Sequence, residues 1–344
     1  MIYKGKICSE NICNGITKRL MYMSLVGLLG LGLMAGCGAR DGDSAASPTE
    51  SSGDASEPLL NSEELASEES ASKEAVSEEP VSEEFDYEEW QRQREAKALA
   101  WYETLTEEDY ATAKSTEELT PDDWQARQLL VLLGDLPEAE TKIYGGMGDG
   151  DLLILEHQGQ RRAFYKVFLT PRSVWPEFCV YDYDGDQTAE IGMICYVISG
   201  TGVAIRDFSI FDSVEDTFDT LYTMPWEEVQ QACDQVWWSY EENVLRIGVG
   251  DEYEEHSLAD THFSGTGIRD LALGDITEFS FGEPGEVFCD VALALALEEQ
   301  ATPLFLEEMG TLYDNGVSWD IDDVHFQVHY DGAGGFWTDG IGLR

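Results

Sequence analysis

An uncharged apolar run that follows Lys18 and Arg19 decides which part of this chain can form a folded domain. The run ends in Met34-Ala35-Gly36-Cys37. A cationic segment, an apolar segment and then a cysteine after small residues are typical of a bacterial lipoprotein signal peptide. We therefore expect residues 1–36 to be removed and Cys37 to carry lipid. The rest of the chain would then lie on the extracytoplasmic face of a cell membrane.

This signal departs mildly from the usual pattern, because Met34 stands where Leu, Val or Ile is common. An uncleaved N-terminal anchor is the alternative, although the run is shorter than the roughly 20 apolar residues of a membrane span. The residues before the run are long for a leader and include Cys8 and Cys13. Either translation starts further downstream or this segment leaves with the signal.

Residues 37–84 are rich in Ser, Glu, Ala and Pro and contain the triplet Ser-Glu-Glu four times. Large apolar side chains are too few here to offset the entropy of ordering the backbone. We predict a disordered tether with an end-to-end distance of ~40 Å, extended further by charge repulsion.

The net charge of −49 limits the partners of the chain. Residues 91–344 alone carry 14 basic and 51 acidic side chains, a net charge of −37. Nucleic acid and anionic lipid head groups both need clustered Lys and Arg, so we expect neither as a partner. A compact domain with this charge repels itself, and bound divalent cations would relieve the repulsion.

The segment 85–139 is predicted to be helical. Thr106 and Asp109 have the spacing of a capping box at a helix start. Thr120-Pro121 has the features of a second helix start, and Gly134 would end that helix after the apolar residues 129–133.

From residue 140 to 344 the pattern changes to short runs of branched and aromatic residues between Gly, Pro and Asp turns. Strands are predicted at 152–156, 163–168, 177–181, 191–198, 207–211, 217–223, 244–249, 271–281 and 287–297. One helix is expected after Pro225, with an apolar stripe of Val229, Cys233, Val236 and Trp237.

Near the C-terminus, Asn315-Gly316 predicts a hairpin and residues 323–330 alternate as in a half-exposed strand. The predicted fold class is α+β: a short N-terminal helical segment, then a mainly antiparallel β domain with one inserted helix.

One loop concentrates the groups that carry chemistry. Acids occupy positions 1, 3, 5 and 9 of the sequence Asp-Tyr-Asp-Gly-Asp-Gln-Thr-Ala-Glu, as Asp182, Asp184, Asp186 and Glu190. Carboxylates this close repel one another, and a hard cation with oxygen ligands converts the repulsion into binding. Ca²⁺ accepts such an irregular shell, and the Thr188 carbonyl is a natural further ligand.

An acidic β-turn is the alternative, since Asp and Gly are common turn residues. Gly185 permits a tight turn. Loops of this type usually have Gly at position 6, where this chain has Gln187, a departure that would weaken affinity or make the site vestigial.

Several segments around this loop carry a resemblance to known proteins. They are Thr170-Pro171-Arg172, Pro176, Tyr181 to Glu190, Gly200-Thr201-Gly202-Val203 and Phe208 to Phe211. Together they resemble a domain of extracytoplasmic proteins of gut Clostridia and are similar to a single integrin-like calcium-loop unit of the FG-GAP or VCBS type. The resemblance implies calcium and a Gram-positive surface. A full propeller needs at least four blades, so none is predicted.

Other chemistry-bearing residues are less specific. Cys179, Cys195, Cys233 and Cys289 are compatible with disulfides outside the cytoplasm or with buried thiols, and three pairings are possible. His325 and His329 would lie ~13 Å apart on a strand, too far to share one ion. Four tryptophans are candidates for a sugar-stacking surface or for core packing: Trp237, Trp238, Trp319 and Trp337.

Two functions follow from these features. The first is a lipid-anchored binding or sensing module with one calcium loop and an unknown protein or glycan ligand. The alternative is a surface hydrolase or glycan-binding protein that acts on cell-wall or dietary polysaccharide. The chain is rich in acids, yet nothing in the sequence picks out a catalytic pair.

Overall fold

The computed structural model describes residues 3–6, 87–126, 128–148, 151–200, 203–214, 217–259, 268–297 and 318–344. Cys37, the tether expected at 37–84 and the hairpin expected at Asn315-Gly316 lie outside these residues. Strands predominate, as expected, and pair in three mainly antiparallel sheets. None of the helices in the described part of the chain is long and apolar enough to span a membrane.

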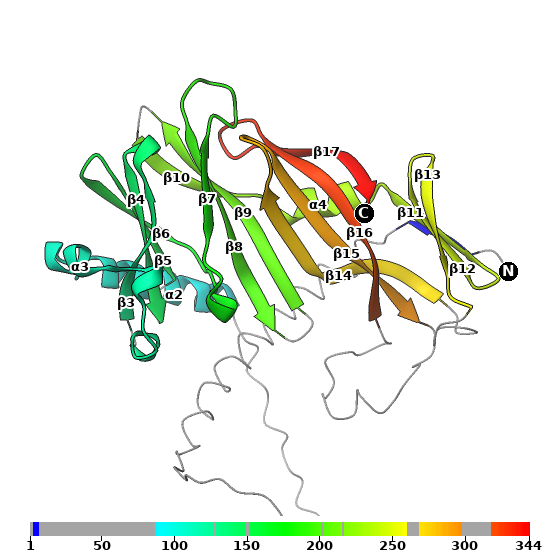
Figure 1. Ribbon diagram of the computed structural model, residues 1–344, viewed down its shortest axis with the longest axis horizontal. Coiled ribbons are helices and arrows are strands. Elements are labelled where there is room, and N and C mark those ends of the chain that lie inside the picture. Colours follow the sequence, from blue (N-terminus) through cyan, green and yellow to red (C-terminus); the bar gives the residue numbers. More distant parts are fainter. Residues whose placement is uncertain are drawn as a thin grey trace, which may run out of the picture. The chain divides into compact units, whose positions relative to one another are not determined.

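The first sheet has five strands in the order β2-β3-β4-β5-β6 (Figure 1). Their bounds are Lys114–Ser115, Gln128–Leu136, Thr141–Gly148, Leu152–His157 and Gln160–Tyr165. Strand β5 is apolar over four consecutive fully buried residues, which indicates that the sheet is covered on both faces. One face packs with strands of the next sheet, and the other packs with the helices.

The helix expected between Thr120 and Gly134 is wrong, because residues 128–136 form the strand β3 and only a 3₁₀ turn at Asp123–Gln125 precedes it. Its apolar run is only five residues long, and a run this short does not distinguish a buried strand from a helix. Here Leu130 and Val131 are buried, and the strand pairs along its length with β4. Short 3₁₀ turns cover Thr116–Glu118, Asp123–Gln125, Pro137–Ala139 and Pro171–Ser173.

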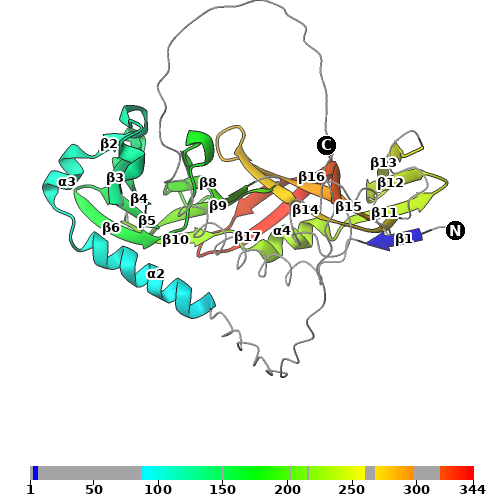
Figure 2. The same cartoon turned by 90° about the horizontal axis from the view of Figure 1, so that it is seen from below.

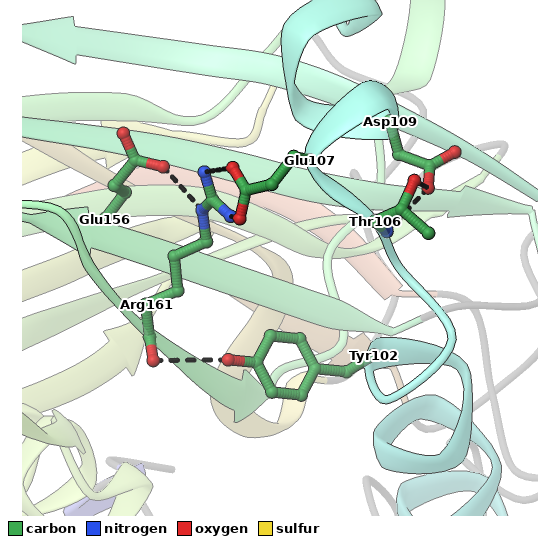
Figure 3. A network of polar contacts seen from close by, with 6 residues as sticks. All are labelled: Tyr102, Thr106, Glu107, Asp109, Glu156 and Arg161. Carbon is green, nitrogen blue, oxygen red and sulfur yellow. Dashed lines mark hydrogen bonds and ion pairs between the residues drawn. The ribbon is translucent and has the colours of Figure 1, made fainter.

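Helices α2 (Tyr87–Tyr102) and α3 (Glu107–Thr112) are attached to the first sheet by one arginine of β6. Figure 3 shows Arg161 donating to both carboxylate oxygens of Glu107, at 2.7 and 3.0 Å, and through Nε to Glu156 at 2.5 Å. The Tyr102 hydroxyl donates to the Arg161 carbonyl oxygen at 3.2 Å. The arginine thus ties both helices to the sheet.

The capping box expected at the start of α3 is confirmed. The Asp109 carboxylate accepts hydrogen bonds from the Thr106 backbone N–H and hydroxyl, each at 2.7 Å (Figure 3). These bonds satisfy groups that the helix itself leaves without a partner.

The second sheet has the order β17-β16-β15-β14-β9-β8-β7, with β10 paired to β9, and it curls into a half-barrel (Figure 1). Its strands are β7 (Glu177–Tyr181), β8 (Glu190–Gly200), β9 (Val203–Val214), β10 (Thr217–Thr223), β14 (Ile268–Phe281), β15 (Val287–Leu297), β16 (Ser318–Tyr330) and β17 (Phe336–Leu343). The alternation expected for 323–330 is confirmed in β16, where every second residue from Val324 to Tyr330 is buried. In the described residues the strands form no closed propeller, as predicted.

The third sheet has the order β1-β11-β12-β13 and contains Tyr3–Lys6, Val236–Glu241, Val244–Val249 and Glu252–Ser257. Its inner residues share one apolar core with the second sheet and with helix α4 (Trp226–Cys233), the expected inserted helix (Figure 2). The helix ends at Cys233, so Val236 and Trp237 do not continue its stripe. They belong to β11, where Val236 is buried and pairs with Val249.

Strand β1 lies within the segment expected to be a signal peptide. It pairs antiparallel with β11, from Tyr3 opposite Tyr240 to Lys6 opposite Trp237. In the unprocessed chain it therefore covers the backbone edge of β11.

Candidate functional site

The acidic loop forms the connection between β7 and β8. Tyr181 pairs with Glu190, which closes a hairpin around residues 182–189. One carboxylate oxygen from each of the four predicted acids lies within 4.8 Å of the others; the four are Asp182, Asp184, Asp186 and Glu190. The structure thus brings together the acids that the sequence proposed as metal ligands.

Backbone N–H groups hold the aspartates in a curled loop. Asp182 accepts from Gly185 at 2.8 Å and from Gln187 at 3.0 Å. Asp184 accepts from the N–H of Asp186 at 3.0 Å. A carboxylate oxygen can accept two bonds, and each of these oxygens accepts one, so a lone pair remains for a cation.

Asp186 accepts from the N–H of Thr188 at 2.6 Å, in the same manner. Thr188 therefore contacts the loop through its N–H. The role of the Thr188 carbonyl as a metal ligand stays a prediction.

Two residues of the loop have left-handed backbone. Gly185 and Gln187 both have φ of +78°. Glycine takes this conformation without strain, whereas a side chain makes it costly by about 1–2 kcal/mol. Gln187 therefore adopts the backbone conformation for which Gly is usual at position 6. Gln in place of Gly at position 6 therefore adds backbone strain, while the loop keeps its curled conformation.

Tyr183 and Glu190 fix the loop to the body of the domain. The Tyr183 ring packs against the main apolar core, in a T-shaped contact with Phe208. A Cβ added at Gly192 would lie 2.6 Å from the Tyr183 hydroxyl, so glycine at that position makes room for the ring. The Tyr183 N–H donates to Glu190 at 2.7 Å.

Glu190 is a buried carboxyl group, 1% exposed. Burial raises its pKa from 4.5 to about 7. The hydrogen bond from Tyr183 opposes this shift, and the negative charges of Asp184, Asp186 and Asp212 add to it. Burial also raises the pKa of Asp184. Concentrated, partly dehydrated negative charge of this kind favours cation binding.

Sequence reasoning missed Asp212, which contributes a fifth negative charge close to the loop. It lies on β9, is 8% exposed and accepts a 2.6 Å hydrogen bond from the Tyr330 hydroxyl of β16. Asp212 lies close to the loop because of the register of β8 and β9. Ile191, which follows Glu190, pairs with Phe211, which precedes Asp212. In the sequence Asp212 follows a short apolar run and precedes Glu215 and Asp216, so nothing there singles it out.

The turn between β16 and β17 also reaches the loop. A Cβ added at Gly332 would lie 2.8 Å from an Asp184 carboxylate oxygen, and Gly332 has φ of +86°. The glycine run after Tyr330 thus lets backbone approach the cluster closely. The glycine-rich composition indicates a turn, but the sequence does not reveal that this turn lies against Asp184.

The cluster has the dimensions of a calcium site. Two oxygens on opposite sides of Ca²⁺, with bonds of ~2.4 Å, lie ~4.8 Å apart. The four carboxylate oxygens all lie within this distance of one another. All donors are hard oxygens, which Ca²⁺ prefers. The residues present therefore fit Ca²⁺.

The cysteines of the described residues are free thiols. Burial raises the pKa of Cys233 to about 12 and holds the pKa values of Cys195 and Cys289 well above the ordinary value. Thiols with such pKa values are poor nucleophiles. For these three cysteines the structure favours the buried-thiol alternative over disulfides, whereas Cys179 is half-buried.

The two C-terminal histidines each pair with a different acid. His325 Nδ1 lies 2.7 Å from Asp290, and His329 Nε2 lies 2.9 Å from Asp339. The two histidines therefore contact different carboxylates.

The tryptophans are divided between the core and the surface. Trp238 is 5% exposed and belongs to the core, so it is no part of a sugar-stacking surface. Trp237 donates to the Gly250 carbonyl at 3.0 Å and packs against Tyr253. Trp337 is 45% exposed and stacks on His329 with ring centroids 3.9 Å apart.

Comparison of the chain with family models, with curated proteins and with solved structures gives no match. The function proposed for the chain therefore depends on its own residues and their geometry.

Proposed function

We propose that the chain is a lipid-anchored extracytoplasmic binding or sensing module that carries one Ca²⁺ in the β7–β8 loop. The observation that carries this proposal is the convergence of four carboxylates on one point. Burial of Glu190 and the nearby charge of Asp212 make that convergence costly without a cation. Buried charges in proteins are usually paired or coordinate a metal ion, and a bound cation would offset the repulsion here.

The anchor is supported by the order of charged, apolar and small residues before Cys37. The tether at 37–84 would then hold the folded part away from the membrane. The resemblance to FG-GAP and VCBS calcium loops agrees with a surface role in a Gram-positive bacterium. Removal of residues 1–36 also removes β1 and leaves β11 as the edge of the third sheet.

Bound Ca²⁺ would act on more than its own loop. Gly332 in the β16–β17 turn approaches Asp184, and Tyr330 at the end of β16 contacts Asp212 of β9. An ion in the loop would therefore favour one arrangement of three neighbouring chain segments.

Two measurements test the proposal separately. Membrane fractionation of the native host, followed by mass spectrometry of the N-terminal peptide, is expected to find lipid on Cys37 and no residues 1–36. A Cys37→Ser variant should lose the lipid. Soluble cytosolic protein with its leader attached would contradict the anchor.

For the calcium loop, thermal melts of the full chain are compared in excess Ca²⁺ and in excess chelator. We expect Ca²⁺ to raise the melting temperature of the wild type and not that of Asp184→Asn. Asp251→Asn removes the same charge at an exposed position outside the loop and serves as the matched control. A melt that chelator leaves unchanged would contradict calcium binding.

A glycan ligand is favoured by one specific observation. One face of the Trp337 ring stacks on His329, and the side chain is 45% exposed, as suits stacking on a sugar ring. Titration with soluble cell-wall and plant oligosaccharides should then quench tryptophan fluorescence in the wild type and less in Trp337→Ala. Equal quenching in both proteins would exclude Trp337 as the contact.

A further inference from the structure

A second group of possible metal ligands lies away from the acidic loop. Glu254 and His256 belong to β13, and Asp322 belongs to β16. One donor atom from each lies within 4.8 Å of the others. His256 Nε2 and an Asp322 carboxylate oxygen are 3.2 Å apart. The function proposed for the calcium loop uses none of these residues.

The positions of Glu254 and His256 in the sheet are unusual for polar side chains. His256 pairs with Leu245 and Glu254 pairs with Ile247 across the β12–β13 ladder. Directly paired residues of an antiparallel ladder lie on the same face. Because Leu245 and Ile247 are fully buried core residues, the two polar side chains occupy the core-facing side of an edge strand.

Asp322 supplies a buried charge at the same place. Its side chain is 4% exposed. The carboxylate of Glu254 lies close by, since a donor atom of each residue belongs to the same cluster. A buried carboxylate beside a second carboxylate is costly unless positive charge is present.

We propose that Glu254, His256 and Asp322 form a site for Zn²⁺ or a similar transition-metal ion, separate from the calcium loop. Imidazole nitrogen suits Zn²⁺, Cu²⁺ and Ni²⁺, while Ca²⁺ prefers oxygen alone. Ligands of a tetrahedral Zn²⁺ with bonds of ~2.0–2.1 Å lie ~3.3 Å apart. The 3.2 Å between His256 and Asp322 matches this separation.

Glu254 is exposed, so its side chain is free to rotate onto an ion that the other two hold. Three protein ligands leave the fourth position of the ion open for water or for a group of a binding partner. The ion would also fasten the edge strand β13 to β16 of the second sheet.

The test is a Co²⁺ titration of the full chain without an affinity tag, followed by displacement with Zn²⁺. Excess Ca²⁺ is present to fill sites made of carboxylates alone. We expect visible Co²⁺ absorption that Zn²⁺ abolishes. The intense near-ultraviolet absorption of a cobalt–thiolate bond should not accompany this signal, because none of the donors is a thiol.

Four variants locate the site and separate it from the calcium loop. His256→Ala should abolish the signal, and Glu254→Gln should weaken binding at least tenfold while leaving the circular dichroism of the chain unchanged. His329→Ala removes the histidine of another His–Asp pair and should leave binding intact. Asp184→Asn should lose Ca²⁺ and keep Co²⁺, so the two proposals fail independently.

Two results would overturn the inference. One is the absence of saturable Co²⁺ absorption in the wild type. The other is equal affinity in the wild type, in Glu254→Gln and in His256→Ala. In either case the cluster is no metal site, and His256 and Asp322 only contact each other.

Discussion

The buried Glu190 makes the stability of the domain depend on pH, and calcium should remove most of this dependence. Its pKa is about 7 in the folded chain and 4.5 as an ordinary glutamate. Below pH 4.5 the carboxyl is protonated in both states and costs nothing. Between pH 4.5 and 7 the unfolded chain ionises first, so the folded state loses stability as the pH rises. Above pH 7 the full loss is present.

The size of this effect follows from the two pKa values. One pKa unit corresponds to ~1.36 kcal/mol, so the shift amounts to about 3 kcal/mol above pH 7. The raised pKa of Asp184 acts in the same direction. In chelator, urea denaturation of the wild type should therefore give a lower free energy of unfolding at pH 8 than at pH 5.

Glu190→Gln isolates the contribution of this one carboxyl group. Glutamine keeps an oxygen that accepts from Tyr183 and has nearly the same volume. We expect the difference in unfolding free energy between the variant and the wild type to change by about 2.5 kcal/mol from pH 5 to pH 8, because part of the loss is already present at pH 5. A difference that stays constant over this range would refute the argument.

Calcium should abolish most of this pH dependence in the wild type, because the ion binds the ionised carboxylate and stabilises the folded state. Binding displaces a proton from Glu190 when the pH is below 7. The apparent Ca²⁺ affinity should then fall about tenfold per pH unit below that value.

Three further predictions concern the loop, the helices and the leader. Gly185→Ala should lower the free energy of unfolding by ~1 kcal/mol in urea denaturation. A Cβ there meets nothing within 4 Å, so only the φ of +78° opposes it. Gln187→Gly should raise the free energy of unfolding by ~0.5 kcal/mol, and changes of the opposite sign would contradict a left-handed backbone at the two positions. Arg161→Ala should lower the free energy of unfolding by ~2 kcal/mol, because the guanidinium donates to Glu107 and lies 3.6 Å from the centroid of the Tyr110 ring. An unchanged denaturation midpoint would show that other contacts hold the helices to the sheet. Removal of residues 1–36 should speed hydrogen exchange in β11, and exchange equal to that of the full chain would show that β1 does not protect this strand.

The strands that could be predicted are those that contain branched and aromatic residues in their own sequence. The bounds of β7, β10, β12 and β15 agree with the sequence expectation, because each contains several apolar, branched or aromatic residues between turn residues. Strand β13 was not predictable. Its sequence, Glu-Tyr-Glu-Glu-His-Ser, is acidic, and its conformation comes from pairing with β12.

The acidic loop was predictable to a similar extent. The spacing of its acids predicted the four groups that converge, because alternate positions of a curled loop point the same way. The contributions of Asp212 and Gly332 depend on strand register and on a turn far along the chain. The left-handed backbone of Gln187 is set by the hydrogen bonds of the whole loop, which residue preference alone does not reveal.

Calorimetric titration of the full chain with Ca²⁺ tests the central claim most directly. At pH 8 we expect one saturable site in the wild type and in Asp251→Asn, and none in Asp184→Asn. At pH 6, buffers of different ionisation enthalpy should reveal proton release as Glu190 gives up its proton. Absence of saturable heat in the wild type, or unchanged binding in Asp184→Asn, would contradict the account.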